Sequence, residues 1–399
     1  MTTSNKGEGI VSDHHLIQTI VRRAQAGADH RLTAEAAASL AVDALAVHLA
    51  GQRFSVTGVS VARQQAALPK TGDVVACSLE SAEGARLRLL VGGQAGAAYA
   101  ADVSWSVTGE GASAPQMAVD PALPPIAATR TMRMDHCDQA GHVNVQVFLE
   151  LVDDAIAALA GRSGLWAALK VIEARVQFKS ELFCGDAVVV RSGVRQVSSE
   201  SADIVHGLFH LASGRLAAVV ETRCGVASAA DLAALGALSE AWAVLPAARP
   251  PADPRPPGAP SSNAIESCRA TIDAWDVDPD DNASMRGIIQ LCSTGARQFL
   301  GAIGLDGLRF AREKITVAAV DYLVSLPIRP RLGQNVVLRT VPLGFSAKSM
   351  RFCHYILDAD TGAVFGTVEI VGVMLDLATH QSTTIPTDVA DTLKRLTAA

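Results

Sequence analysis

The sequence predicts an α+β fold made of three related domains, each combining one long helix with an antiparallel sheet. Three observations support this prediction. An apolar segment with helical spacing, followed by several strand-like runs, occurs three times along the 399 residues. In each block a Gly-Asp or Gly-Gln turn opens a β-branched run, and a later glycine turn joins two further strands. Self-similarity on this scale indicates a repeat architecture.

The glycine turns define the spacing of the repeat. The first turns read KTGDVVACS, LFCGDAVVVRS and PRLGQNVVLRT, and the later turns lie in GGQAGAAYA, LASGRLAAV and ADTGAVFGT. The two glycines of each block are 24, 29 and 29 residues apart, so the second and third blocks match most closely. The glycines concerned are Gly72 and Gly96, Gly185 and Gly214, and Gly333 and Gly362.

Each block begins with a segment of helical periodicity. The first helix is expected in LTAEAAASLAVDALAVHLA, where alanine favours helix, and the third in SMRGIIQLCSTGARQFLGAIG. The middle helix has an apolar face, and its polar residues are expected mostly on the opposite side. The apolar face consists of Val145, Phe148, Leu149, Val152, Ile156 and Leu159, and the polar side of Gln146, Glu150, Asp153 and Asp154.

The repeat and one proline-rich stretch give the domain boundaries. AARPPADPRPPGAPSSN can hold neither a helix nor a central strand, so we expect an extended linker over residues 246–263. A helix over about residues 229–244 is expected to close the domain before it. The predicted domains are residues 1–115, which we interpret as structural, 125–245, and 264–399.

Composition excludes several classes of protein. Hydrophobic residues make up 49% and charged residues 19%, as in a globular protein with large cores. A net charge of −6 gives no case for nucleic acid or an acidic membrane surface. The sequence has no membrane-length apolar run and no signal pattern. Seven scattered cysteines without CxxC indicate reduced thiols, so we expect a cytoplasmic protein.

The stretch HCDQAGHVN (136–144) carries the main candidate site, because it places an acid, a glycine, a histidine and an asparagine before the middle helix. The bland alternative is a polar helix cap. A zinc site is not expected, because the ligands are crowded in sequence and lack distant partners. Cys137 is interpreted as a half-buried neighbour rather than a nucleophile. The sequence calls for neither a metal nor a cofactor.

The segment MRMDHCDQAGHVNVQVFLELVDDA resembles hotdog-fold thioesterases of the 4-hydroxybenzoyl-CoA thioesterase type and, at the same place, plant acyl-ACP thioesterases. The likeness covers residues 125–228 well and 268–380 moderately. The third block looks most like the betainyl-CoA thioesterase branch, without its Gly-His-Met. The resemblance implies three hotdog domains, each with a sheet wrapped around a central helix, and the hydrolysis of an acyl-CoA or acyl-ACP thioester.

The resemblance also implies roles for the loop residues. Asp138 matches the catalytic carboxylate of the family, as a nucleophile or as a base for water. Gly141 lets the backbone approach the substrate. His142 is expected to donate to the thioester or to the leaving sulfur, and Asn144 to cap the helix or orient a water. Glu181 corresponds loosely to an acid of the plant enzymes.

The other two blocks depart from this pattern. An offset of 140, from Leu305 aligned with Leu165, places Asp278, Asp281, Asn282 and Ser284 on Asp138, Gly141, His142 and Asn144. The acid is kept and the glycine and histidine are lost. DVDPDDN fails as a calcium loop, since it lacks the loop glycine and the final glutamate, and is interpreted as a solvated cap. The first block offers only Asp29 and His30.

CoA is anionic and needs local cations. Lys179, Arg191 and Arg195 flank the middle strands and are candidates for its phosphates, with ordinary surface solvation as the alternative. Hotdog domains usually pair edge to edge, so the middle and third blocks are expected to pair with each other. The first block is expected to pair with a second chain, giving a dimer of six hotdog units.

Thioester hydrolysis at the middle domain is the leading prediction for function. The alternative is a scaffold protein whose hotdog domains bind CoA or acyl-carrier thioesters without cleaving them, because two of the three copies have lost the full motif. Hydratase or dehydratase chemistry would depend on Asp29 and His30 alone. The sequence leaves the acyl chain and head group open.

Overall fold

A computed structural model shows two compact units in this chain. The structure describes residues 15–20, 31–48, 54–64, 68–69, 74–83, 86–93, 96–107, 126–138, 141–163, 169–226, 231, 233, 235, 258–278, 280–379 and 381–397. Unit 1 comprises residues 1–169, 179–218 and 226–246, and unit 2 comprises residues 170–178, 219–225 and 247–399. We refer to the described residues 15–107, 126–226 and 258–397 as the first, middle and third segments.

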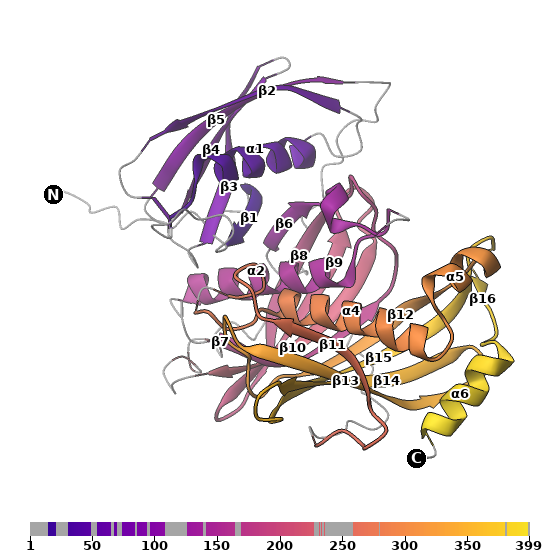
Figure 1. Ribbon diagram of the computed structural model, residues 1–399. Helices are drawn as coiled ribbons and strands as arrows, with labels where there is room; N and C mark the ends of the chain where they lie inside the picture. Colours follow the sequence, from indigo (N-terminus) through magenta and orange to yellow (C-terminus); the bar gives the residue numbers. More distant parts are fainter. Residues whose placement is uncertain are drawn as a thin grey trace. The chain divides into compact units, whose positions relative to one another are not determined.

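The first segment lies in unit 1 and has one helix and five described strands. The strands form an antiparallel sheet in the order β1-β3-β4-β5-β2. In Figure 1 the helix lies across one face of these strands. The elements are β1 (His15–Ile20), α1 (Ala34–His48), β2 (Phe54–Arg63), β3 (Val74–Glu83), β4 (Arg86–Gly93) and β5 (Gly96–Val107).

Small side chains on α1 allow close packing on this sheet. Ala37, Ala41 and Ala44 have no exposed surface and share one core cluster with Val75, Leu89 and other strand residues. Alanine loses no side-chain entropy on burial and lets helix and sheet backbones approach. The helix predicted in this segment is therefore present as a core element.

The middle segment supplies the rest of unit 1. Its first strand β6 pairs with β8 on one edge and with β1 on the other, where Gln18 is opposite Thr129. The sequence predicts that the first segment pairs with a second chain, but the β1 edge of this segment has β6 of the same chain as its neighbour. The elements are β6 (Ile126–Thr131), the 3-10 helix η2 (Met134–His136), α2 (Val145–Ser163), β8 (Ala187–Val197) and β9 (Ser201–His210).

Unit 2 combines the third segment with β7 (Leu169–Phe178) and most of β10 (Leu216–Val226). Its strand order is β11-β13-β14-β15-β12-β7-β10, so the third segment repeats the order found in the first. The elements are β11 (Ile265–Thr271), α4 (Met285–Ala302), α5 (Gly307–Glu313), β12 (Ile315–Ser325), β13 (Asn335–Phe345), β14 (Ser349–Asp358), β15 (Val364–Asp376), β16 (Gln381–Ser382) and α6 (Thr387–Thr397).

The pairing of β7 with β12 confirms that the middle and third segments join edge to edge. The turn glycines Gly185 and Gly333 differ by 148 in number. The same offset relates Arg175 to Leu323, and these two residues lie opposite each other in the antiparallel register. Two equivalent strands therefore meet at equivalent positions, as they would across a two-fold axis.

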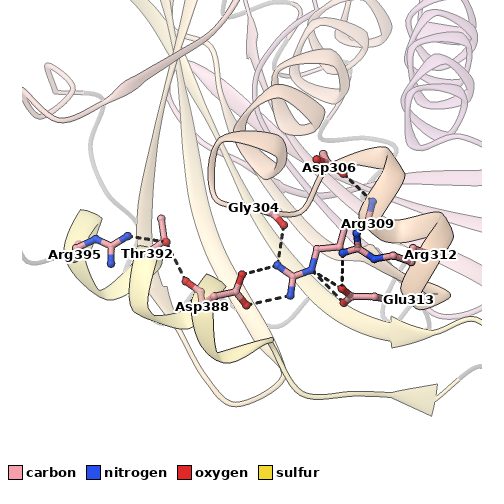
Figure 2. Close-up of polar contacts among 8 residues, drawn as sticks. All are labelled: Gly304, Asp306, Arg309, Arg312, Glu313, Asp388, Thr392 and Arg395. Atoms are coloured by element: carbon pink, nitrogen blue, oxygen red, sulfur yellow. Dashed lines mark hydrogen bonds and ion pairs between the residues drawn. The ribbon is translucent and has the colours of Figure 1, made fainter.

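The C-terminal helix α6 is held by one arginine. Arg309 on α5 donates from Nη1 and Nη2 to the two carboxylate oxygens of Asp388 on α6, at 2.6 and 3.0 Å. It also donates to the Gly304 carbonyl and to Glu313 (Figure 2). Val389 and Leu393 form the buried side of α6. Arg309 thus joins α5, α6 and the preceding loop.

The linker and the closing helix predicted before it fall largely outside the described residues. The described residues also exclude the turn at Gly72, Leu165, and the pair Asp29 and His30. The seven cysteines all lie within the described part and are free thiols.

Candidate active site

The loop between β6 and α2 forms a tight turn around Asp138. The Asp138 N–H donates to the His142 carbonyl at 2.9 Å, and the Gly141 N–H donates to the Asp138 carbonyl at 3.0 Å. The Asp138 carboxylate accepts the His142 N–H at 3.0 Å. Gly141 has a φ of +80°, a conformation that glycine adopts without the steric cost of a Cβ. The turn thus places the carboxylate and the imidazole four residues apart on one short loop.

A second stretch of chain holds this loop in place. The Val143 N–H donates to the Leu182 carbonyl at 2.8 Å, and the Cys184 N–H to the Gly141 carbonyl at 3.2 Å. Glu181 at the start of this stretch places Oε1 3.8 Å from His142 Nδ1. The Phe183 ring meets the His142 ring edge-on, with centroids 5.0 Å apart. The structure therefore brings Glu181 beside His142.

The polar groups of the loop lie where α2 begins. The Asn144 N–H donates to the His136 carbonyl at 2.9 Å, and its carbonyl accepts the Val147 N–H at 3.0 Å. Asp138 is exposed, whereas the His142 side chain is 32% exposed. A helix N-terminus carries positive potential from its first backbone N–H groups. An anion that forms near this loop would be stabilised there.

The thiol beside the site is not set up for nucleophilic attack. The loss of water around the Cys137 thiol raises its pKa to about 11, with smaller contributions from the neighbouring Cys184 and Asp138. The thiol donates to the Arg133 carbonyl at 3.3 Å. A thiol with this pKa is protonated at neutral pH, and the thiolate is the reactive form. Cys137 is therefore a partly buried neighbour of Asp138.

Below the loop, a buried ion cluster corrects one prediction. The sequence predicts Glu150 and Asp154 on the polar side of the middle helix, opposite its apolar face, but both are buried, at 8% and 1% exposed. Arg130 on β6 donates to Glu150 Oε1 at 2.6 Å and also to Asp154. A buried carboxylate is tolerated when a cation pairs with it, so Arg130 makes this burial feasible. The predicted apolar face of the helix is otherwise buried, at Phe148, Leu149, Val152, Ile156 and Leu159.

Two further buried ionisable groups adjoin the cluster. Burial raises the pKa of Asp43 on α1 to about 6, although Arg133 and Arg130 lower it. Burial, followed by the charges of Arg130 and Arg133, lowers the pKa of His136 to about 4. His136 Nδ1 accepts the Arg133 N–H at 3.2 Å. His136 is thus neutral at pH 7 and acts as a structural support of the loop.

The candidate cations for CoA lie in different surroundings. Lys179 and Arg195 are exposed, but Arg191 is only 3% exposed. Ala187 is opposite Thr131 at the end of β6 nearest the loop. At about 3.3 Å per residue, Arg191 and Arg195 lie roughly 13 and 26 Å further along β8. The strand therefore carries both arginines away from the loop.

The third segment repeats the loop in detail. Asp278 donates its N–H to the Asn282 carbonyl at 2.7 Å, and its Oδ1 accepts the Asn282 N–H at 3.0 Å. Asp281 has a φ of +63°, at the position of Gly141. These contacts confirm the alignment by an offset of 140. The remaining pairs also correspond, namely Ala283 to Pro330, Ser284 to Asp276 and Leu332 to Asp281.

The two loops differ in the residue that faces the acid. Arg329 places Nη1 3.4 Å from Asp278 Oδ2 and donates from Nη2 to the Val171 carbonyl at 2.9 Å. By the offset of 148, the residue at this position in the middle segment is Glu181. Burial raises the pKa of Asp278, although the Asn282 N–H and Arg329 lower it. The N-cap of α4 is Ser284, whose Oγ accepts the Gly287 N–H at 3.1 Å, so the stretch DVDPDDN (276–282) does not supply the cap that the sequence predicts there.

Sequence reasoning missed Arg329 and Arg130. Arg329 was detectable, because the repeat aligns it with Glu181 and so reveals a reversal of charge beside the acid. The i, i+4 spacing of Glu150 and Asp154 was a weaker signal, since it places two acids on one helix face without naming their partner. Both residues act through partners far away in sequence.

The described residues contain neither a metal-binding group nor a membrane-spanning helix. No group of three or more His, Cys, Asp or Glu side chains among them is arranged to hold a metal ion. None of their helices is long and apolar enough to cross a membrane.

Solved structures similar to this chain share little sequence with it. An acyl-ACP thioesterase from Bacteroides thetaiotaomicron matches with a TM-score of 0.44 and 10% identity, over 61% of this chain and 96% of that one. A 12:0-ACP thioesterase from Umbellularia californica gives 0.46 and 8%, over 61% and 92%. A 1,4-dihydroxy-2-naphthoyl-CoA thioesterase from Synechocystis gives 0.30 and 12%, over 33% and 96%. No curated protein shows significant sequence similarity.

The family model gives the decisive comparison. The thioesterase-like superfamily matches the chain twice, over residues 132–251 and 272–393, which together make up more than half of it. Both ranges contain one of the two equivalent loops. The prediction of a hotdog fold with antiparallel sheets and of a thioesterase is confirmed at this level. The chain belongs to the thioesterase-like superfamily.

Proposed function

We propose that this protein hydrolyses an acyl-CoA or acyl-ACP thioester at the loop of the middle segment, with Asp138 as the base or nucleophile. The observation that carries the proposal is the exposed Asp138 carboxylate beside His142 at the start of α2. The equivalent acid of the third segment faces Arg329, an arrangement that favours a structural ion pair over proton transfer.

The chemistry follows from these groups. As a base, Asp138 takes a proton from water while the oxygen attacks the thioester carbonyl carbon. The negative charge moves to the carbonyl oxygen near the helix N-terminus, where backbone N–H groups stabilise it. Collapse then breaks the carbon–sulfur bond, and His142 is placed to give a proton to the leaving sulfur. Glu181, with Oε1 3.8 Å from His142 Nδ1, is placed to orient the imidazole.

Asp138 as a nucleophile is the second route to the same products. The carboxylate would attack the carbonyl carbon directly, expel the thiolate and leave an anhydride that water opens. A single turnover in ¹⁸O-labelled water separates the routes. Label in Asp138 identifies an anhydride that water opens at the Asp138 carbonyl, whereas the base route puts label only in the released acid.

Replacing Asp138 by Asn tests the proposal. Turnover in a thiol-release assay, across short, long, aromatic and betainyl acyl-CoA and acyl-ACP substrates, should fall by about 10²–10⁴-fold, which is the usual contribution of a positioned acid–base group. The fold should persist, because the amide can still accept the His142 N–H. Asp278→Asn is the matched control in the equivalent loop and should keep its activity. Full activity of Asp138→Asn would reject the assignment.

A scaffold that binds thioesters without cleaving them is the alternative. The loop of the third segment motivates it, because Asp278 is paired with Arg329 there. Measurable binding of acyl-CoA with no thiol release from any substrate would favour this function.

We also propose that the first segment is a third hotdog domain. Its order β1-β3-β4-β5-β2 is the same as β11-β13-β14-β15-β12, and α1 packs on its sheet. The proposed domains remain residues 1–115, 125–245 and 264–399, with a dimer of six hotdog units. The free cysteines support a cytoplasmic location.

A further inference from the structure

Two thiols, those of Cys137 and Cys184, lie in contact beside the candidate active site. The Cys137 side chain is in hydrogen-bonding contact with the Cys184 side chain, and it also donates to the Arg133 carbonyl at 3.3 Å. Cys184 is exposed and Cys137 is partly buried. Of the other five cysteines, four are buried and Cys268 is partly exposed. Cys137 and Cys184 thus form a pair of thiols that solvent reaches from the Cys184 side.

The backbone on both sides of this pair is fixed by hydrogen bonds. The Cys184 N–H donates to the Gly141 carbonyl at 3.2 Å, at the other end of the turn that contains Asp138. The next residue, Gly185, donates its N–H to the Met132 carbonyl at 2.7 Å. On the other strand of chain, the Cys137 N–H donates to a carbonyl of η2 at 3.1 Å. The contact between the thiols therefore belongs to the folded loop.

The equivalent loop of the third segment has no thiols at these positions. The offsets of 140 and 148 place Val277 on Cys137 and Leu332 on Cys184. The backbone is nevertheless the same, because the Leu332 N–H donates to the Asp281 carbonyl at 2.9 Å, as the Cys184 N–H does in the middle segment. Two apolar side chains thus suffice to build the loop. The thiol pair occurs in the loop that carries the candidate catalytic acid.

We propose that Cys137 and Cys184 form a disulfide by exchange with a small-molecule disulfide, and that this bridge stops turnover at Asp138 until it is reduced. The formation of the bridge is independent of the proposed function, whereas its effect on turnover rests on that function. Disulfides in a reducing compartment are usually transient and serve catalysis or redox sensing.

The exchange takes two steps. The Cys184 sulfur attacks one sulfur of the small-molecule disulfide, forms a mixed disulfide and releases one small thiol. The Cys137 sulfur then attacks the Cys184 sulfur, forms the bridge and releases the second small thiol. The two protein thiols are oxidised, the small-molecule disulfide is reduced to two thiols, and the protons of the protein thiols pass to those products.

The surroundings of the two thiols set this order. Cys184 is exposed and meets the small-molecule disulfide first. The pKa of about 11 keeps Cys137 protonated at neutral pH, so Cys137 reacts slowly with reagents in solution. Its contact with Cys184 makes the second step intramolecular, which raises the effective concentration of the Cys137 sulfur.

The bridge would displace the residue next to Asp138. Bonded sulfur atoms are about 2.05 Å apart, closer than a hydrogen bond to sulfur allows, so the bond draws Cys137 towards Cys184. Bridging also removes the thiol proton that Cys137 donates to the Arg133 carbonyl. Asp138 follows directly and holds His142 through its N–H and its carboxylate. Since a displacement of about 1 Å can lower a rate by about 10²-fold, we expect turnover to fall by about 10- to 100-fold.

Peptide mapping tests the bridge without any substrate. The folded protein is incubated with oxidised glutathione, its remaining thiols are alkylated in denaturant, and it is cut with trypsin. Residues 134–162 and 180–191, which contain Cys137 and Cys184, should appear as one linked peptide that dithiothreitol separates. A bridge to a different cysteine, or glutathione retained on Cys184 without a bridge, would overturn the proposal.

Turnover before and after oxidation tests the effect on the site. Chromatography of the remaining acyl-CoA measures it, because a disulfide reagent for thiols would itself react with the enzyme. The oxidised wild type should lose about 10- to 100-fold in turnover and recover once it is reduced and the reductant is removed. Cys184→Ser should keep its activity in oxidised glutathione. Cys268→Ser is the matched control, since it removes the other partly exposed thiol, and should respond like the wild type.

A bridge in the third loop provides the second control. In a Cys184→Ser background, Val277→Cys with Leu332→Cys should form a disulfide, because the backbone of the two loops matches. Turnover should then be unchanged by oxidation. An equal loss of turnover in this variant, full turnover of the bridged wild type, or equal inactivation of Cys184→Ser would each overturn the proposal. If the reduced wild type cleaves no substrate, the proposed function fails, and peptide mapping still decides whether the bridge forms.

Discussion

At the scale of single residues, Asp43 and His136 affect stability in opposite ways. The pKa of Asp43 is raised to about 6, so between about pH 4 and 6 the folded chain holds a proton that the unfolded chain releases. This contribution to stability is present at low pH and lost as the pH rises through 6. The pKa of His136 is lowered to about 4, so its contribution is lost as the pH falls from about 6.5 to 4.

Replacing Asp43 by Asn should separate the two effects. The variant should be more stable than the wild type at pH 7.5, by at most about 3 kcal/mol, because it no longer buries an ionised carboxylate. The difference in unfolding free energy between the variant and the wild type should shrink towards zero at pH 4. The contribution of His136 does not affect this difference, because both proteins contain His136. Urea unfolding at pH 4.5, 5.5 and 7.5 measures this.

Asp135 provides the control for Asp43. It lies 3.4 Å from Arg133 and its side chain is 70% exposed, so Asp135→Asn removes a charge beside the same arginine without a burial effect. If the stability gain of Asp43→Asn were the same at every pH, burial of the charge would not be its cause.

The loop residues were predictable because their spacing is local. Asp138, Gly141 and His142 lie within five residues, and a turn of that length allows few arrangements. Their neighbours were not predictable in the same way. Arg329 reaches Asp278 from 51 residues away, and Arg130 reaches Glu150 from 20 residues away. Contacts of this kind depend on which strands become neighbours.

At the scale of elements, the Arg309 cluster controls how firmly α6 is attached. Arg309→Lys keeps the charge but loses the planar fork that matches the Asp388 carboxylate. We expect α6 to loosen by up to about 1 kcal/mol, the range measured for exposed ion pairs. Faster hydrogen exchange over residues 387–397, with unchanged exchange in β13, would show this.

Arg395→Lys on the same helix is the matched control. Arg395 donates to Thr392, which lies one turn earlier on the same helix (Figure 2). This bond does not join α6 to another element. Its replacement should leave exchange in α6 unchanged. Equal loosening by both variants would mean that helix propensity, rather than the bond between α5 and α6, sets the stability of α6.

Elements with a local signature were the ones that sequence could predict. The helices at Ala34–His48, Val145–Ser163 and Met285–Ala302 fall where apolar periodicity placed them. The partner of β1 was not foreseen, because edge pairing is decided by the geometry of whole sheets rather than by one strand's pattern. The short helix α5 lacks a repeated signal in the other two segments.

At the scale of the whole molecule, the linker does not separate the two units, because unit 2 includes β7 from before it. A specific protease site inserted within residues 246–257 should therefore cut the chain without releasing a free fragment. The pairing of residues 173–177 with 321–325, the ion pair of Arg175 with Asp321, and the bond from Arg329 to Val171 should hold the two pieces together.

Gel filtration of the cut protein measures this outcome. Both pieces should elute together in buffer and separate in denaturant. A C-terminal piece that elutes alone and stays folded would show that the third segment is complete without β7.

Arg175 and Leu323 occupy equivalent positions of the repeat but are different residues. This difference shows how one chain can hold two unlike loops. In a pair of identical subunits every mutation appears twice, so a change that harms one site harms both. Joining the copies in one chain gives each position its own codon and lets selection act on them separately. An arginine can then arise on the axis opposite a leucine, and another can occupy the third loop while the middle loop keeps Glu181. Covalent fusion thus lets the two loops change independently of each other.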